Sequence, residues 1–242
     1  MNAIYSLTPF TMTDYPDKIA AVAWFAGCNM RCAYCYNTPV VLAKFNETSV
    51  QNNTEILSLQ QNGISDDEFV RFLDKRVGKL DGVVFSGGEC TLARSFLPLA
   101  REVKQRNLAL KVDTNGSNLI VLKQAISENL IDYIALDFKA TKEKFHAITG
   151  LNFYENFIKT LEFLLANDVS FEVRTTIHTD LLNEYDISQM AEILWQKGYI
   201  GEYFLQNFLD TGKNFGNICK SKNCFDPTKI NSKIPIKLRN FQ

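Results

Sequence analysis

The feature that most constrains this chain is a short loop, residues 28–35, in which three cysteines follow the spacing C-x3-C-x2-C. A cubane iron–sulfur cluster normally takes four cysteines, so Cys28, Cys32 and Cys35 would leave one iron with an open coordination position. Zinc sites usually pair two C-x2-4-C knuckles or add histidines, and both histidines of this chain lie far from the loop. The spacing therefore favours a [4Fe-4S] cluster with an open iron, and a structural zinc or a group of buried thiols is the alternative.

Length and composition indicate one domain. The chain has 242 residues, of which 46% are hydrophobic, enough for one substantial core and too few for two ordinary α/β domains. We therefore expect a single domain over residues 1–242.

Charge and hydropathy exclude several classes of partner. The net charge is −1, so no global basic field would attract nucleic acid or an anionic membrane. The longest apolar run, Ile19–Ala26, is too short to cross a bilayer, and the N-terminal residues lack the basic region of a signal peptide. Clustered cysteines without a secretion signal indicate a reducing compartment, so we expect a cytoplasmic protein.

Short β-branched or apolar runs alternate with helical patterns, which is typical of parallel β/α units. A capping box, Ser65-x-x-Glu68, marks the start of one expected helix. Asp186, with Gln189 three residues later, marks the start of another. The expected strands are Ile19–Phe25, Gly82–Phe85, Ala109–Val112, Tyr133–Leu136, Phe171–Thr175 and Tyr203–Leu205. The expected helices are Asp67–Gly78, Ala93–Arg106, Asn118–Glu128, Asn156–Ala166 and Ile187–Lys197. Six such units predict an α/β fold, a partial (β/α)6 TIM-like barrel of parallel strands.

Two segments fall outside this alternation. Residues 45–62 are polar and rich in asparagine, and we interpret them as a surface insertion before the second strand. The tail, residues 213–242, has no clear periodicity, and we expect it to be irregular.

The unusual motifs of the chain sit where the expected strands end. In β/α barrels the loops at the C-terminal ends of the strands carry the chemistry. The cysteine loop follows the first strand, and Ser86–Glu89 and Asp113–Gly116 follow the second and third. Asp137–Lys139 closes the fourth strand, Arg174-Thr175 ends the fifth, and Gln206-Asn207 ends the sixth. The topology therefore predicts one site built from all of these segments.

Gly87, Gly88 and Glu89 suit a close approach to a ligand. Glycines allow positive φ and close backbone contact, and Glu89 offers an acceptor for an ammonium group. An ordinary turn between a strand and a helix is the alternative explanation of this sequence.

Asp113, Thr114 and Asp137 bring two carboxylates and a hydroxyl to neighbouring strand ends. Uncompensated carboxylates in a partly buried site are costly, so we expect a cation or a cationic ligand between them, with Lys139 balancing the charge. Capping of the following helices is the alternative role for these side chains.

The cysteine loop resembles that of the radical S-adenosylmethionine (SAM) superfamily, and Gly87-Gly88-Glu89 resembles its GGE motif. The resemblance implies that SAM chelates the fourth iron, that the reduced cluster cleaves it to a 5′-deoxyadenosyl radical, and that the GGE motif holds its amino group. Cys28, Cys32 and Cys35 would then be both the metal ligands and the catalytic centre.

The segments Val112–Gly116 and Leu136–Lys139 resemble those of glycyl-radical-enzyme activases. That resemblance implies a monovalent-cation site lined by Asp113, Thr114 and Asp137, and contacts to SAM from Asp137 and Lys139, with Arg174 as a further site residue. It also implies a glycyl radical enzyme as partner and a flavodoxin- or ferredoxin-type electron donor.

Further segments, Thr13–Pro16 and Asn37–Pro39, resemble most closely the activating proteins of anaerobic ribonucleoside-triphosphate reductases. The chain departs from the activase pattern at Tyr36, where histidine is common, and at Cys90, where proline is usual. Neither departure removes a cluster ligand.

Three further cysteines, Cys90, Cys219 and Cys224, lie outside the cysteine loop. We interpret Cys90 as a packed thiol, because a fourth ligand would abolish the open iron. Cys219 and Cys224 cannot bind a second cubane by themselves, and we expect no catalytic role for them.

The rival functions are a radical SAM enzyme acting on a small molecule or nucleoside, such as 7-carboxy-7-deazaguanine synthase, and a non-catalytic zinc or electron-transfer protein.

Overall fold

The computed structural model describes residues 3–43 and 63–241 of the chain. The strands are β1 (Ile4–Thr11), β2 (Ala20–Phe25), β3 (Gly82–Gly87), β4 (Ala109–Thr114), β5 (Tyr133–Asp137), β6 (Ser170–Ile177), β7 (Tyr203–Asn207) and β8 (Ile236–Arg239). The helices are α1 (Thr38–Leu42), α2 (Asp66–Asp74), α3 (Phe96–Gln105), α4 (Leu119–Ser127), α5 (Lys142–Thr149), α6 (Tyr154–Leu165) and α7 (Glu184–Gln196). Two short 3-10 helices, η1 (Cys90–Leu92) and η2 (Pro227–Lys229), complete the elements of the described part.

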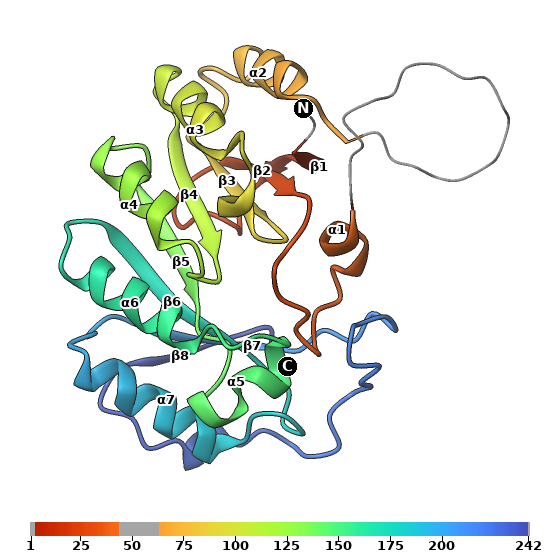
Figure 1. Ribbon diagram of the computed structural model, residues 1–242, viewed down its shortest axis with the longest axis vertical. Coiled ribbons are helices and arrows are strands. Elements are labelled where there is room, and N and C mark those ends of the chain that lie inside the picture. The colour runs from red at the N-terminus through yellow and green to blue at the C-terminus, as the bar shows by residue number, and fades with distance from the viewer. Residues whose placement is uncertain (1–2, 44–62, 242) are drawn as a thin grey trace, which may run out of the picture.

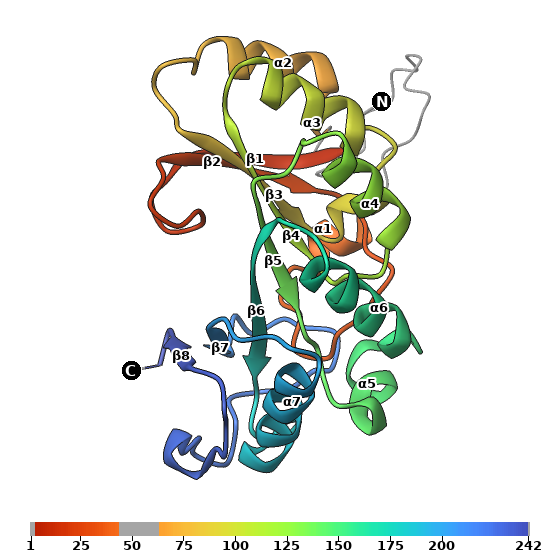
Figure 2. The same cartoon turned by 90° about the vertical axis from the view of Figure 1, so that its left-hand side faces the viewer.

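These strands form one sheet in which each strand pairs with its neighbour in the sequence, from β1 to β8. β1 runs antiparallel to β2, and every later pair is parallel. The two edge strands lie at opposite ends of the molecule in both views (Figures 1 and 2), so the sheet curves without closing. The expected α/β fold, a partial barrel of parallel strands, is confirmed.

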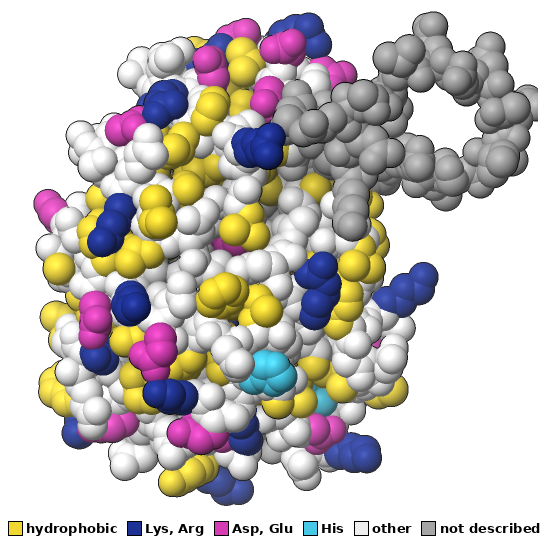
Figure 3. Space-filling view, viewed as in Figure 1, with side chains coloured by type: hydrophobic (Ala, Val, Ile, Leu, Met, Phe, Trp, Pro, Cys, Tyr) yellow, Lys and Arg dark blue, Asp and Glu magenta, His cyan; other side chains and the backbone are white. Residues whose placement is uncertain are grey.

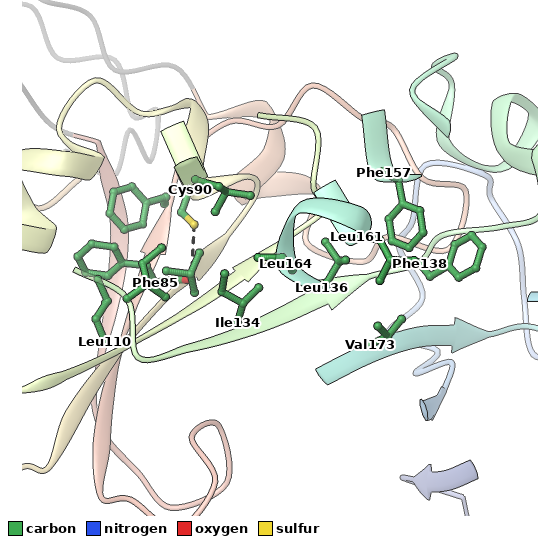
Figure 4. Packing of buried hydrophobic residues seen from close by; sticks show 14 of the residues in the cluster. Phe85, Cys90, Leu110, Ile134, Leu136, Phe138, Phe157, Leu161, Leu164 and Val173 are labelled. Atoms are coloured by element: carbon green, nitrogen blue, oxygen red, sulfur yellow. Dashed lines mark hydrogen bonds between the residues drawn. The ribbon is translucent and has the colours of Figure 1, made fainter. Parts of the chain in front are cut away.

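The core lies between the sheet and the helices that cover its outer face (Figure 2). The middle of β3, Val83–Phe85, is fully buried, as expected for a parallel strand covered on both sides. Phe85 packs against Phe96 of α3, and farther along the sheet Phe138 stacks on Phe157 of α6 with ring centroids 4.3 Å apart (Figure 4). This continuous apolar layer holds the strand ends, and hence the loops after them, in fixed relative positions.

Local signals set where the helices begin. The capping box predicted at Ser65 and Glu68 is present, with the side chain of each residue accepting a hydrogen bond from the backbone N–H of the other. α7 begins earlier than expected, because Asn183 is the N-cap and Asp186 is the third helical residue of that capping box. The helix therefore opens at Glu184 rather than Ile187.

The expectations for the two edges and the tail need correction. β1 was not predicted, and the tail is not irregular throughout, because residues 236–239 form β8 beside β7. Edge strands carry weak signals: β1 contains a proline, and β8 is short and charged. The expected insertion at residues 45–62 lies outside the described residues.

The surface agrees with the charge balance of the sequence. Figure 3 shows lysines and arginines interspersed with acidic side chains over the visible face, without a large patch of one sign. Within the described residues, the helices are all too short or too polar to cross a membrane.

Candidate active site at the strand ends

A cavity of about 280 Å³ opens at the C-terminal ends of the parallel strands. It gathers the three cysteines of residues 28–35 with residues that follow β3 to β7. Its lining includes Cys28, Cys32, Cys35, Gly87, Gly88, Asp113, Thr114, Asp137, Lys139, Arg174, Gln206 and Asn207. Of the predicted site residues only Glu89 is missing from this lining.

A larger cavity of about 430 Å³ lies beside it, toward the β1–β2 connection and β8. The two cavities share Arg174, Gln206 and Asn240, but the cysteines line only the smaller one. We place the site in the smaller cavity because it holds the groups able to bind a metal cluster.

The cysteine loop is held by backbone hydrogen bonds to the end of α5. The N–H of Arg31 donates to the carbonyl of Thr149, and that of Ala33 donates to the carbonyl of Ile148, both at 2.8 Å. The N–H of Cys35 donates to the carbonyl of Cys32, also at 2.8 Å, which makes a tight turn between the last two cysteines. The loop is thus fixed on its outer side while its thiols line the cavity.

Burial keeps these thiols protonated when no metal is bound. It raises the pKa of Cys28 to about 12 and that of Cys32 to about 11, and it also raises the pKa of Cys35. Cluster binding must therefore displace protons from all three. Within the described residues, no three His, Cys, Asp or Glu side chains are already gathered around a position for one metal ion.

The cavity fits a bound group of the predicted kind. The Tyr34 hydroxyl is buried near the Cys32 thiol, belongs to a residue lining this cavity, and makes no hydrogen bond of ordinary geometry within residues 3–43 and 63–241. A buried hydroxyl normally has a partner, so a group bound in the cavity would satisfy it. Three thiols on one loop and an unpaired hydroxyl suit the predicted iron–sulfur cluster.

Glu89 lies beneath the cavity, with an exposed fraction of 1%. Its Oε1 accepts from the hydroxyls of Thr91 and Thr114 at 2.5 and 2.8 Å, and its Oε2 accepts from the N–H of Asn115 at 2.7 Å. Burial raises the pKa of this carboxyl, although these hydrogen bonds oppose the shift. Glu89 thus ties the loop after β3 to the loop after β4.

The two glycines pack against the start of the cysteine loop. Gly87 has φ +115°, and a Cβ there would lie 2.3 Å from the nitrogen of Phe25. A Cβ on Gly88 would lie 1.9 Å from the carbonyl oxygen of Gly27. These glycines therefore allow the end of β3 to approach the chain immediately before Cys28.

The strand-end carboxylates form a buried ion-pair network. Arg174 joins them, with Nε 2.5 Å from Oδ1 of Asp137 and Nη2 3.3 Å from Oδ2 of Asp113. Lys139 Nζ lies 2.9 Å from Oδ2 of Asp137, and Lys111 pairs with Oδ1 of Asp113. Three cationic side chains thus pair with the two carboxylates, and the pairing of Lys139 with Asp137 agrees with the expectation that Lys139 balances their charge.

These ion pairs determine the protonation states of Asp113 and Asp137. Burial alone would raise the pKa of both carboxyls, but Arg174 and the neighbouring lysines outweigh it. The pKa of Asp137 falls to about 2, and that of Asp113 also lies below its usual value. The pKa of Lys139 is well above its usual value, mainly because Asp137 outweighs the effect of burial. All of these groups are charged at neutral pH.

Sequence reasoning did not assign roles to Lys111 and Asn115. Asn115 donates to the side-chain oxygen of Asn29 at 3.0 Å, which links the loop after β4 to the cysteine loop. A signal for Lys111 existed, because it lies two residues before Asp113 on a strand and so shares its face. A lysine in an otherwise apolar strand has to have a partner.

The remaining cysteines lie away from the cavity. Cys90 is fully buried in the core near Phe85 (Figure 4). The carbonyl oxygens of Phe85 and Asp113, 3.6 and 3.4 Å from its sulfur, can each accept its single thiol proton, which agrees with a packed thiol. Cys219 and Cys224 are exposed in the tail. The tail does reach the cysteine loop, because the N–H of Gly216 donates to the carbonyl of Ala33 at 2.9 Å.

Comparison with known proteins places this architecture in a family. The radical SAM superfamily matches residues 22–194. A Methanocaldococcus jannaschii protein, provisionally named as a glycyl-radical enzyme activating enzyme, is 30% identical over 199 residues, which is 79% of this chain and 75% of the relative. The pyruvate formate-lyase-activating enzyme of Clostridium pasteurianum is 27% identical over 167 residues, which is 67% of this chain and 64% of that enzyme.

A solved structure shares the fold. SuiB of Streptococcus suis, in its structure bound to S-adenosylmethionine, aligns with a TM-score of 0.61 at 13% identity. The alignment covers 88% of this chain and 48% of that protein.

Proposed function

We propose that this chain, which belongs to the radical SAM superfamily, is an activating enzyme that generates a glycyl radical on a partner enzyme. The observation that carries the proposal is that one cavity gathers the three thiols and the polar strand-end groups. The relatives named as glycyl-radical or pyruvate formate-lyase activating enzymes support the choice of reaction.

In this proposal Cys28, Cys32 and Cys35 hold a [4Fe-4S] cluster. When bound, the cluster supplies the electron that cleaves SAM reductively, and SAM supplies the radical that abstracts hydrogen from glycine. Thiols buried to this degree must lose their protons to the solvent before they can bind iron. A reducing compartment such as the cytoplasm keeps such thiols available.

Residues of the strand ends would bind and orient SAM. Lys139 carries a fixed ammonium at the cavity wall, beside Asp137, and can donate to an anionic group of the ligand. Gly87 and Gly88 expose backbone at the wall, and Arg174 keeps both carboxylates in place. Glu89 would act indirectly, because its oxygens position Thr114 and Asn115.

The partner enters from the open side of the sheet. A glycyl radical enzyme would present its glycine on a loop, and the sheet does not close, because β1 and β8 are not paired with each other. We infer an anaerobic ribonucleoside-triphosphate reductase from the motifs Thr13–Pro16 and Asn37–Pro39. The Clostridium pasteurianum relative makes a pyruvate formate-lyase the second candidate. A flavodoxin or ferredoxin would provide the electron.

The test uses cluster-loaded protein, reduced by dithionite in the absence of air and supplied with SAM. Each candidate partner, taken from the same organism, is added separately, and the glycyl radical is recorded by electron paramagnetic resonance. We expect the radical doublet on the ribonucleotide reductase. A doublet on pyruvate formate-lyase alone would select the second candidate. The activase proposal would be overturned if neither partner acquired a radical while a nucleoside or another small molecule stimulated 5′-deoxyadenosine formation.

A further inference from the structure

We infer that protein cations neutralise Asp113 and Asp137, with Lys111 in the place of a bound monovalent cation, so that SAM binding needs no alkali cation. The inference rests on the assignment of SAM to this cavity and is independent of the choice of partner. It departs from the cation site that the resemblance to activases implies.

The first argument is that all four carboxylate oxygens are already occupied. Asp113 uses Oδ1 for Lys111 and Oδ2 for both the Ser86 hydroxyl, at 2.9 Å, and Arg174. Asp137 uses Oδ1 for Arg174 and Oδ2 for Lys139. A cation that bound here would have to share these oxygens with the protein cations or displace one of them.

The second argument is the charge balance. Three cationic side chains face two carboxylates, and none of the five side chains is more than 22% exposed. The group thus carries a positive charge of about one before any ligand binds. A further cation would enter a region of low dielectric against this charge, where repulsion is poorly screened.

The third argument concerns Thr114, the expected hydroxyl ligand. Its hydroxyl donates to Oε1 of Glu89 at 2.8 Å and accepts from the N–H of Gly116 at 3.1 Å. Thr114 itself is only 1% exposed. Thr114 lines the cavity, but its hydroxyl is already engaged as both donor and acceptor within the loops after β3 and β4, which leaves it less able to hold an ion.

Lys111 is the residue that makes this arrangement possible. It lies two residues before Asp113 on β4, on the same face of the strand, and its side chain is 3% exposed. Lys111 lines the larger neighbouring cavity, whereas Arg174 and Lys139 line the cavity that holds the cysteines. Its ammonium therefore pairs with Asp113 without occupying the cysteine cavity. We regard Lys111 as a positioning residue, since it does not line the cavity that holds the cysteines.

The test measures SAM binding to cluster-loaded protein by calorimetry, and 5′-deoxyadenosine formation without any partner. Tetramethylammonium is exchanged for K⁺ or Na⁺ at constant ionic strength. Wild-type affinity should change by less than about twofold. Lys111→Met should lose affinity about tenfold in tetramethylammonium, about 1.4 kcal/mol, and regain it in K⁺ or Na⁺. Broadening of the ²³Na resonance, read independently of turnover, should be seen with Lys111→Met and be absent with wild type.

Two matched variants control the result. Lys111→Arg keeps the charge and should remain independent of alkali cations. Lys142→Met removes an exposed lysine that pairs with Glu155 and should behave as wild type. If the affinity of the wild-type protein for SAM depended about tenfold on K⁺ or Na⁺, the inference would be overturned. This measurement uses only the wild-type protein, so it tests the inference even if Lys111→Met fails to fold. Unchanged affinity in Lys111→Met, or a loss that neither cation restores, would contradict the role given to Lys111.

Discussion

The six cysteines of this chain occupy three kinds of surroundings, and these surroundings divide their chemistry. Cys28, Cys32 and Cys35 line one cavity, Cys90 is packed in the core, and the two tail cysteines are exposed. A metal cluster needs several thiolates converging on one accessible space. The three residues that the spacing singled out are also the three that share a cavity.

We predict that alanine at any one of Cys28, Cys32 or Cys35 abolishes cluster binding, because two thiolates cannot hold a cubane with an open iron. Iron content per chain after anaerobic reconstitution should fall close to zero in each variant. Cys219→Ala is the control and should keep the parent iron content. An intact cluster in Cys32→Ala, or its loss in Cys219→Ala, would show that the ligands were misassigned.

A second prediction at the residue scale concerns the stability of the fold at low pH. The pKa of Asp137 in the folded protein is about 2, against 3.8 for the free group, so its ionised form stabilises the fold. That stability is present above the unfolded pKa and is lost as the pH falls from about 4 to about 2, amounting to roughly 2 kcal/mol. The free energy of unfolding should therefore drop more steeply with acid in wild type than in Asp137→Asn. Parallel curves for the two proteins between about pH 4 and pH 2 would contradict the pairing of Asp137 with Arg174 and Lys139.

The residue scale also shows where sequence reasoning stops. The three cysteines, Asp113 and Asp137 could be found because spacing and strand ends are visible in the sequence. The partners of the carboxylates could not, because Lys111 and Arg174 meet them only after strands β4 to β6 are placed side by side. Glu89 was expected to face a ligand, but its burial places it under the site.

At the scale of elements, the site depends on contact between the end of β3 and the segment that leads from β2 into the cysteine loop. The N–H of Gly88 donates to the carbonyl of Phe25 at 2.8 Å, and the N–H of Glu89 donates to that of Gly27 at 2.9 Å. Such contact is possible because neither Gly87 nor Gly88 has a side chain. A sequence shows that glycines are present, but it does not show which chain segment they admit.

We predict that Gly88→Ala impairs cluster assembly, because the new Cβ would fall 1.9 Å from the Gly27 oxygen and push the cysteine loop away. Overpacking of this kind typically costs about 1–3 kcal/mol, so the protein should still fold. Iron content should be well below that of the parent while the far-ultraviolet circular dichroism is retained. Gly78→Ala is the control, since Gly78 has φ +74° but no atom within 4 Å of the added Cβ. Equal iron content in both variants would show that this contact does not shape the loop.

The elements themselves were largely predictable. Each of the six expected strands is present as one of β2 to β7, because buried parallel strands have dense runs of apolar residues. β1 and β8 were missed because edge strands bury less surface and tolerate proline and charge. α1 and α5 were not expected either.

At the scale of the whole molecule, the cysteine loop lies between three segments distant in sequence. The end of α5 holds its outer side, the loop after β4 reaches it through Asn115 and Asn29, and the tail contacts it at Gly216. The Arg31 guanidinium also lies over the ring of Phe215, 5.6 Å from the centroid. The cysteine loop is thus held by three separate parts of the chain.

The central claim is that a radical formed from SAM in this cavity abstracts a hydrogen from a glycine of the partner. Isotope transfer tests this claim most directly. The partner is produced with deuterium at the α-carbon of its glycines and incubated with the reduced protein and SAM in ordinary water. Mass spectrometry of the 5′-deoxyadenosine should find one deuterium per molecule, formed in step with the glycyl radical. 5′-Deoxyadenosine that carries only protium, while the glycyl radical accumulates, would contradict direct abstraction from glycine at this site.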